Sequence, residues 1–347
     1  MSRFVFFAFV SALAPALLGA QAPTGSGDVL RVGPGVTPPR LLHKVEPEYS
    51  PSARAAHVQG TVVLQLVVDE KGRATDITLI SPLGFGLDEQ AETAVEKWTF
   101  APGVKDGRPV KILASVEVNF RFPQIWFDEK AERQRTSFNV ALQSLKRVNA
   151  STKAVDRAVK SMQDLSERGF PPAMYLVGVW EINGEHITKD PAHGFALIQK
   201  AAAKDYGPAI YEIAVHRIEG QGLSRDVEKG LDEMRQAAVL GSRQAQFYLG
   251  NRYSEGNGVP RELDRARRYF RLCAAQGAAI CQYKLGSLLL DAPERPERDY
   301  VQAVAWFQLA GEQGLQEANS IASREAANLT PAQISWVKTL KAQLVRK

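Results

Sequence analysis

The chain has 347 residues, of which 45% are hydrophobic and 23% are charged, and its formal net charge is +5. The length favours two domains, and the composition is ordinary for a globular protein. Because no dense run of Lys and Arg accompanies the positive charge, we expect no nucleic-acid partner.

Residues 1–20 have the pattern of a signal peptide. Arg3 supplies a positive charge, and the apolar run from Phe4 to Leu18 is short for a membrane span. We expect this segment to be cleaved; the alternative is that it is retained as a membrane anchor. Residues 21–38, rich in Gly, Pro and Thr, form a flexible linker whose fully extended reach is about 60 Å.

Residues 39–123 predict a small α+β domain, an antiparallel three-stranded sheet with two helices. The apolar periodicity and the turn signals place these elements in order: a short helix from Ser50-Pro51, strands at 61–68 and 75–80, a helix at 87–98, and a last strand at 110–122. Gly72 supplies the positive φ that the loop between the first two strands needs.

The last predicted strand alternates most regularly, with its even-numbered apolar residues facing inward. At a sheet edge, the backbone N–H and C=O groups of such a strand pair with an extended peptide. The predicted peptide-binding residues are Lys111, Leu113, Ser115, Glu117, Asn119 and Arg121. The alternative is an edge that is merely covered by the linker.

Several motifs occur together in this region: Pro47 with Tyr49-Ser50-Pro51, DEKGRATD at 69–76, KWTFAP at 97–102 and DGRPV at 106–110. They resemble a TonB C-terminal domain over residues 39–123. In TonB proteins this domain captures a short segment of outer-membrane receptors, so the resemblance implies the same capability here.

Residues 173–317 repeat with a fixed period. Ala173, Ala209, Ala245 and Cys281 lie 36 residues apart, and a period in this range indicates a solenoid of stacked helix pairs. An aromatic residue lies two positions further on in each copy, and we expect it in the core between helices: Tyr175, Tyr211, Phe247 and Tyr283. An acid at the start of each second helix is expected to cap it: Asp190, Asp226 and Glu262.

The four units resemble Sel1-like repeats, a branch of the tetratricopeptide-like solenoids, and the resemblance implies an all-α, protein-binding scaffold with a concave groove. Residues 124–172 are expected to be linker helices with a degenerate capping repeat. Residues 318–347 are expected to be C-terminal capping helices, with a capping box from Thr330 to Gln333.

The two cysteines occupy alanine positions of the repeat. Cys273 corresponds to Ala237 and Cys281 to Ala245 of the preceding copy, so the two positions face each other across a turn. Their spacing resembles the disulfide of cysteine-rich Sel1-like proteins, which implies a Cys273–Cys281 bond in an oxidising compartment. The alternative is two buried thiols that replace alanines.

The sequence contains no recognisable catalytic motif. The histidines are scattered, and no Cys or carboxylate set around His186 and His193 has metal-ligand spacing. We therefore expect no enzyme activity, no cofactor and no metal. Four arginines gather on one predicted helix, and we expect them on a solvated face, with a patch for an acidic partner as the alternative: Arg265, Arg267, Arg268 and Arg271.

The leading hypothesis is a non-catalytic, periplasmic adaptor that binds protein or peptide partners, including outer-membrane receptor segments, through the sheet edge and the solenoid groove. The alternative is a TonB-family energy transducer for transport, held at the inner membrane by residues 4–20 and facing the periplasm. Membrane association is expected only if that segment is retained.

Overall fold

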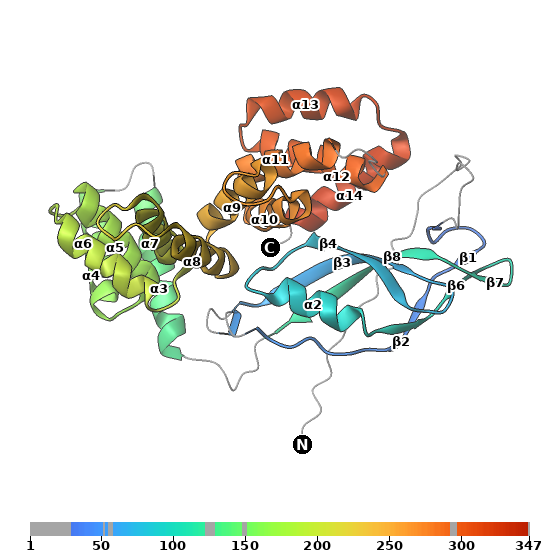
Figure 1. Ribbon diagram of the computed structural model, residues 1–347, viewed down its shortest axis with the longest axis horizontal. Helices are drawn as coiled ribbons and strands as arrows, with labels where there is room; N and C mark the ends of the chain where they lie inside the picture. The colour runs from blue at the N-terminus through green and yellow to red at the C-terminus, as the bar shows by residue number, and fades with distance from the viewer. Residues whose placement is uncertain are drawn as a thin grey trace, which may run out of the picture. The chain divides into compact units, whose positions relative to one another are not determined.

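The computed structural model describes residues 29–50, 53–54, 58–121, 129–147, 151–291 and 297–345. The predicted signal peptide and the linker residues 21–28 lie outside the described residues. The chain divides into two compact units (Figure 1): Met1–Arg121 together with Glu262–Lys347, and Phe122–Arg261. Each is described by itself. Among the described residues, no helix combines the length and apolarity that crossing a membrane requires.

The predicted three-stranded antiparallel sheet is present in the first unit. It consists of β3 (Gly60–Val68), β4 (Ala74–Ser81) and β8 (Ile112–Phe120) in the order β4-β3-β8. The β3–β4 turn forms because the Asp69 carboxylate accepts hydrogen bonds from the backbone N–H groups of Lys71 and Arg73. Helix α2 (Leu87–Val95) follows β4.

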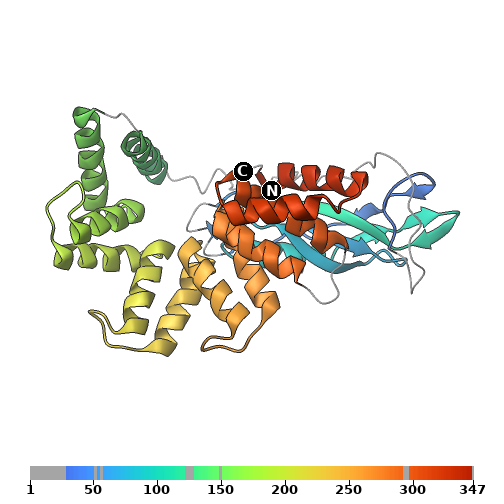
Figure 2. The same ribbon diagram turned by 90° about the horizontal axis from the view of Figure 1, so that it is seen from above.

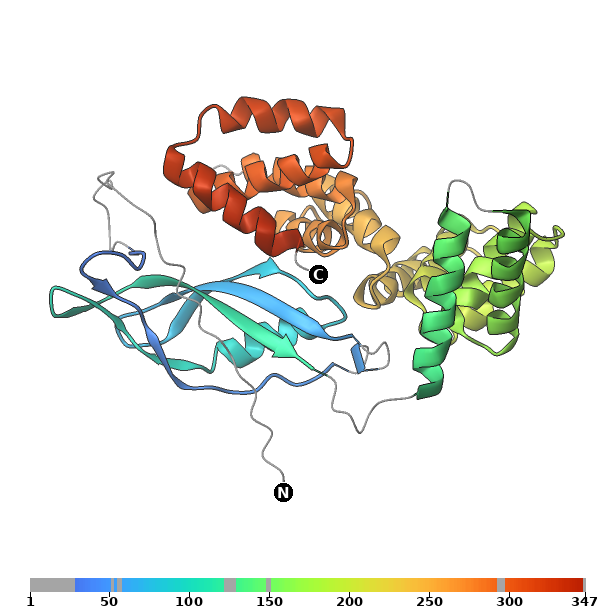
Figure 3. The same ribbon diagram turned by 180° about the vertical axis from the view of Figure 1, so that it is seen from behind.

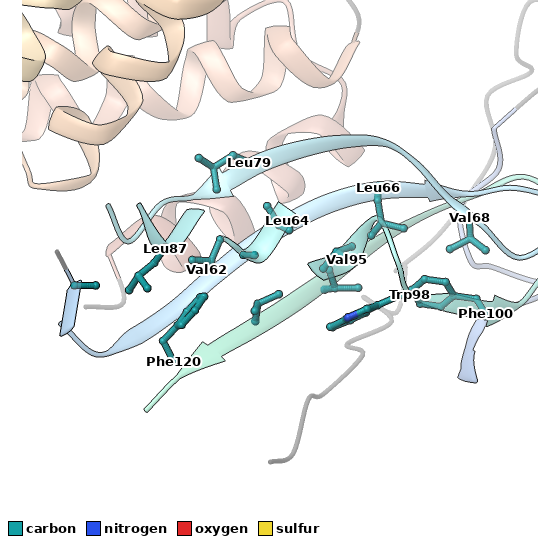
Figure 4. Close-up of a cluster of buried hydrophobic side chains, with 14 residues drawn as sticks. Val62, Leu64, Leu66, Val68, Leu79, Leu87, Val95, Trp98, Phe100 and Phe120 are labelled. Atoms are coloured by element: carbon teal, nitrogen blue, oxygen red, sulfur yellow. The ribbon is translucent and has the colours of Figure 1, made fainter. Parts of the chain in front are cut away.

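One face of this sheet holds the core of the small domain (Figure 4). The even-numbered residues of β3 have no exposed surface: Val62, Leu64, Leu66 and Val68. They pack with Leu87 and Val95 of α2 and with Trp98. The Trp98 indole N–H donates to the backbone C=O of Val45 at 2.8 Å, so its polar atom is satisfied inside the core.

Short strands that the sequence analysis did not predict extend this domain. β2 (Arg40–His43) pairs with β5 (Thr99–Ala101), and β1 (Val36–Thr37), β6 (Gly103–Lys105) and β7 (Arg108–Val110) form a second small sheet. The prediction of one continuous strand from Val110 was therefore wrong at its start. Val110 pairs with Gly103 in β6–β7, and the chain leaves strand conformation at Lys111. Phe122 lies outside the described residues.

The second unit consists of successive antiparallel helices, coloured green to yellow in Figure 2. These helices are α3 (Glu129–Lys146), α4 (Thr152–Glu167), α5 (Pro171–Asn183), α6 (Pro191–Ala202), α7 (Gly207–Glu219), α8 (Val227–Val239) and α9 (Arg243–Glu255). Helices α5 and α6 cross closely at Gly178. A methyl group at this position would lie 2.6 Å from the backbone oxygen of Gly194, so only glycine fits without movement.

Two of the three predicted capping acids cap their helices. Asp190 accepts a hydrogen bond from the backbone N–H of His193, and Asp226 accepts one from Lys229, both at 3.0 Å. The capping prediction was wrong for Glu262, whose side chain makes no capping hydrogen bond. Its carboxylate instead lies 2.9 Å from the guanidinium of Arg265, three residues further along the chain.

The first unit also contains the last helices of the chain (Figure 3). They are α10 (Leu263–Ala275), α11 (Ala279–Leu290), α12 (Glu297–Glu312), α13 (Gln316–Ala326) and α14 (Pro331–Val345). The predicted capping box at the start of α14 is present: the Gln333 amide oxygen accepts from Thr330 N–H, and the Thr330 hydroxyl accepts from Gln333 N–H.

These helices pack against the small domain within the same unit. Ile80 of β4 shares a buried cluster with Val301 and Val304 of α12 and with Val337 and Leu340 of α14. Arg268 of α10 pairs with two carboxylates of α2, those of Glu89 and Glu92. The expectation of a solvated face was therefore wrong for Arg268, which is engaged in ion pairs. Its partners lie far away in the sequence, so the local helix pattern does not reveal them.

Candidate functional site

The edge of the sheet is formed by β8, and hydrogen bonds show which of its backbone groups point outward. Leu30 N–H donates to the Lys111 C=O, and Leu113 N–H donates to the Leu30 C=O, both at 2.8 Å. Lys111 and Leu113 therefore direct these groups away from β3. Successive residues of a strand direct their backbone groups to opposite edges, so Ser115, Glu117 and Asn119 also direct theirs outward.

The even-numbered residues of β8 instead hydrogen-bond β3 in an uninterrupted register, from Val68–Ile112 to Gly60–Phe120. Their side chains belong to the core: Ile112, Val116, Val118 and Phe120 are 0–2% exposed. Tyr49 closes one end of this row by packing edge-on against Phe120, with ring centres 5.6 Å apart. Burial raises the pKa of Tyr49 to about 12, and its hydroxyl donates to the Val58 backbone oxygen.

The odd-numbered side chains lie on the other face of β8 and are only partly exposed. Asn119 is already engaged across the strands, since its amide oxygen accepts a hydrogen bond from the Thr61 hydroxyl at 2.6 Å. Arg121 follows the end of β8 and is exposed. A ligand at this edge would therefore bind mainly the backbone N–H and C=O groups of β8 and less its side chains.

The edge has an occupied part and an open part. Leu30 forms a parallel bridge with Ile112 and occupies the outward groups of Lys111 and Leu113. Within the described residues, the outward groups of Ser115, Glu117 and Asn119 make no backbone hydrogen bond. The unpaired stretch has the length of a short peptide strand.

A second candidate surface lies on the helices of the other unit. A cavity of about 440 Å³ is lined by α7 and α9 residues, including Tyr211, Phe247, Tyr248 and Arg252. The Arg252 guanidinium donates to the Tyr248 hydroxyl at 2.8 Å. Two of the recurring aromatic residues, Tyr211 and Phe247, are half-buried and line this partly open cavity, so the expectation that they lie in the core was wrong for these two.

The two cysteines form a disulfide between α10 and α11, with Cα atoms 5.8 Å apart. Both residues are fully buried. The two cysteines therefore lie opposite each other across the turn, as the repeat pattern predicts.

His186 and His193 make ordinary contacts. His193 lies 2.6 Å from the Glu181 carboxylate through Nδ1, and the His186 ring packs edge-on against Trp180. Among the described residues, no group of three or more His, Cys, Asp or Glu side chains is arranged to hold a metal ion.

Comparison with protein families identifies both parts of the chain. The Gram-negative bacterial TonB protein C-terminal family matches residues 45–122, and the Sel1 repeat matches residues 171–206, 207–242, 243–277 and 279–315. The chain is thus a fusion of these two kinds of domain, a small α+β domain followed by an all-α solenoid.

Relatives of the small domain are TonB proteins. The chain is 31% identical over 85 residues to Protein TonB of Vibrio cholerae serotype O1, covering 24% of this chain and 35% of that protein. It is 34% identical over 97 residues to Protein TonB of Yersinia enterocolitica, covering 26% and 38%. The chain thus spans little more than a third of the length of these curated relatives.

Two solved structures match part of the chain. A Sel1 repeat protein from Oxalobacter formigenes superposes with a TM-score of 0.45 at 21% identity, covering 63% of this chain and 92% of that one. A protective antigen of uropathogenic Escherichia coli with an SLR fold gives 0.45 at 24% identity, covering 65% and 48%.

Proposed function

We propose that this chain, in which a TonB C-terminal domain is joined to four Sel1 repeats, is a non-catalytic adaptor that captures an extended segment of a partner protein on β8. The observation that carries the proposal is the row of outward backbone groups at Ser115, Glu117 and Asn119, which has no backbone partner within the described residues. An extended peptide satisfies such groups by adding a strand to the sheet.

Because backbone groups are the same for every residue, this edge places few demands on the sequence of the peptide that binds. Main-chain hydrogen bonds supply the affinity, and the half-buried odd-numbered side chains supply the selectivity. Similarity to TonB proteins supports segments of outer-membrane receptors as the partners, and it supports a location in the periplasm. The cavity on α7 and α9 is the second protein-binding surface of this adaptor.

The contact of Leu30 with β8 favours the adaptor over a long-reach energy transducer. If residues 4–20 remained in a membrane, only residues 21–28 would separate that anchor from Val29. Eight residues span about 30 Å at most, half of the reach expected from the whole linker. We expect this distance to be too short for work across a periplasm.

The proposal is tested by proline substitution on β8. Ser115→Pro and Glu117→Pro each remove one outward N–H and leave the hydrogen bonds to β3 in place. Ser115→Ala and Glu117→Gln are matched controls, because they change the side chain and keep the N–H. The probe is a set of immobilised synthetic peptides that together cover the sequences of outer-membrane receptors from the same genome.

We expect the proline variants to lose peptide binding by at least about tenfold and the controls to keep it. Binding that survives both proline changes, in protein whose circular dichroism is unchanged, would refute capture by this edge.

A further inference from the structure

The edge of β8 already carries a short strand, and it comes from the chain itself. Leu30 makes two main-chain hydrogen bonds with Lys111 and Leu113 at 2.8 Å and forms a parallel bridge with Ile112. This is the same pairing that a captured peptide makes. The linker therefore occupies, in the free protein, part of the site that the proposed function assigns to a partner.

A second contact holds the residue that follows Leu30. The Arg31 guanidinium lies 3.9 Å from the centre of the Trp336 ring on α14, within the range of a cation–π interaction. Trp336 itself packs beside the cluster that contains Val337 and Leu340. Leu30 is thus held on the sheet edge while its neighbour is held on the C-terminal helix.

The attachment is small enough to be displaced. Among the described linker residues, only Leu30 bridges β8, because the chain then turns: Gly33 pairs with Val36, and β1 continues the chain along β6. The two hydrogen bonds of Leu30 and the cation–π contact of Arg31 are among the contacts that oppose displacement, whereas a partner strand along the whole of β8 also gains the outward groups of Ser115, Glu117 and Asn119. A partner segment long enough to cover all of β8 therefore displaces the linker. A shorter segment binds only the open groups and leaves Leu30 in place.

We infer that residues Val29–Arg31 act as an intramolecular competitor for the peptide-binding edge, released when a partner strand extends past Ser115 toward Lys111. This inference rests on the proposed function. It makes partner affinity depend on Arg31 and Trp336, neither of which lies on the open part of the edge. By linkage, partner binding in turn weakens the Arg31–Trp336 contact.

The contact itself is tested by hydrogen exchange on the full chain, without any ligand. Leu30→Pro removes the N–H that donates to Lys111, and Leu30→Ala is the matched control that keeps it. We expect the Leu113 amide to exchange about tenfold faster in Leu30→Pro. The Val116 and Val118 amides, which face β3, are expected to keep their rates. An unchanged Leu113 amide would overturn the inference.

The regulatory role is tested with the receptor-segment peptides described above. Arg31→Ala and Trp336→Ala are expected to raise affinity for a peptide that covers the whole edge by about three- to tenfold, because the competitor is released. Arg108→Ala, an exposed arginine on β7, is the control and is expected to have no effect. If Ser115→Pro abolishes binding while Arg31→Ala and Trp336→Ala leave it unchanged, the inference fails and the proposed function stands. If neither Ser115→Pro nor Glu117→Pro has an effect, the proposed function fails, whatever the exchange of Leu113 shows.

Discussion

Arg268 on α10 lies 2.8 Å from Glu89 on α2, nitrogen Nη2 to oxygen Oε1. Glu92, one turn further along α2, lies 3.6 Å from the same nitrogen. These ion pairs and the cluster around Ile80 join the small domain to the C-terminal helices within one compact unit. Both side chains of the closest pair remain partly exposed, so the apolar cluster contributes most of the stability of this contact.

Truncating Ile80 tests whether these parts unfold together. Ile80 is 5% exposed and packs on α12 and α14, so Ile80→Ala is expected to lower the free energy of unfolding by about 2–4 kcal/mol. Hydrogen exchange is expected to accelerate in both the sheet and α14. Ile334→Ala, at an exposed isoleucine of α14, is the control and is expected to change stability by less than about 0.5 kcal/mol. If the hydrogen-exchange rates in α14 were the same in Ile80→Ala as in the natural chain, this coupling would be contradicted.

The buried carboxyl of Asp88 predicts a pH dependence. Its pKa is raised to about 6: burial and the neighbouring Glu89 raise it, whereas Arg268 and the backbone N–H groups of Leu83 and Gly84 oppose the shift. The folded state therefore binds a proton more tightly than the unfolded state. This stabilisation is complete below the unfolded pKa and is lost as the pH rises through 6.

Between pH 7 and pH 5, the Asp88 contribution is expected to raise the free energy of unfolding by about 1 kcal/mol. Urea denaturation at both values measures it. Asp88→Asn, which does not titrate, is expected to lose this part of the pH slope. If the free energy of unfolding of Asp88→Asn depended on pH as strongly as that of the natural chain, groups other than Asp88 would be responsible.

The close crossing of α5 and α6 predicts a position-specific cost. Gly194→Ala places a methyl group 2.5 Å from the Gly178 backbone oxygen, so a helix must move, and we expect a loss of about 1–3 kcal/mol. Gly230 is the corresponding residue of the next repeat. Its added methyl group would meet Cγ1 of Ile218 at 2.5 Å, but the backbone oxygen of Ala214, which corresponds to Gly178, lies further away at 3.1 Å. Gly230→Ala is therefore expected to cost less, and equal melting temperatures for the two variants would refute the backbone explanation.

Removing the disulfide is expected to destabilise the first unit. Closing the short loop between Cys273 and Cys281 stabilises by about 2.5 kcal/mol in the chain-entropy model. The double variant Cys273→Ala, Cys281→Ala restores the residues found at these positions in the preceding repeat, so its cavity cost is small. Denaturation with and without a reducing agent measures the effect. A natural chain that reducing agent does not destabilise, although its thiols then become labelled, would contradict the estimate.

The sequence by itself determined the features that depend on local periodicity. Alternation placed Val62, Leu64 and Val116 on one face of a sheet, because a side chain in a strand can point only to one face or the other. The 36-residue period located the helix pairs, and it brought Cys273 and Cys281 together because each unit repeats the geometry of its neighbour.

Only the tertiary structure decided the contacts between segments that are distant in sequence. Nothing near Val110 shows that it pairs in β7 rather than continuing β8, because both environments accept an apolar residue with the same alternation. Leu30 carries no strand pattern, and its place on β8 depends on which backbone groups the folded sheet leaves unpaired. Arg268 has the same local sequence whether it meets water or Glu89, so its partner is set by how α10 packs against α2.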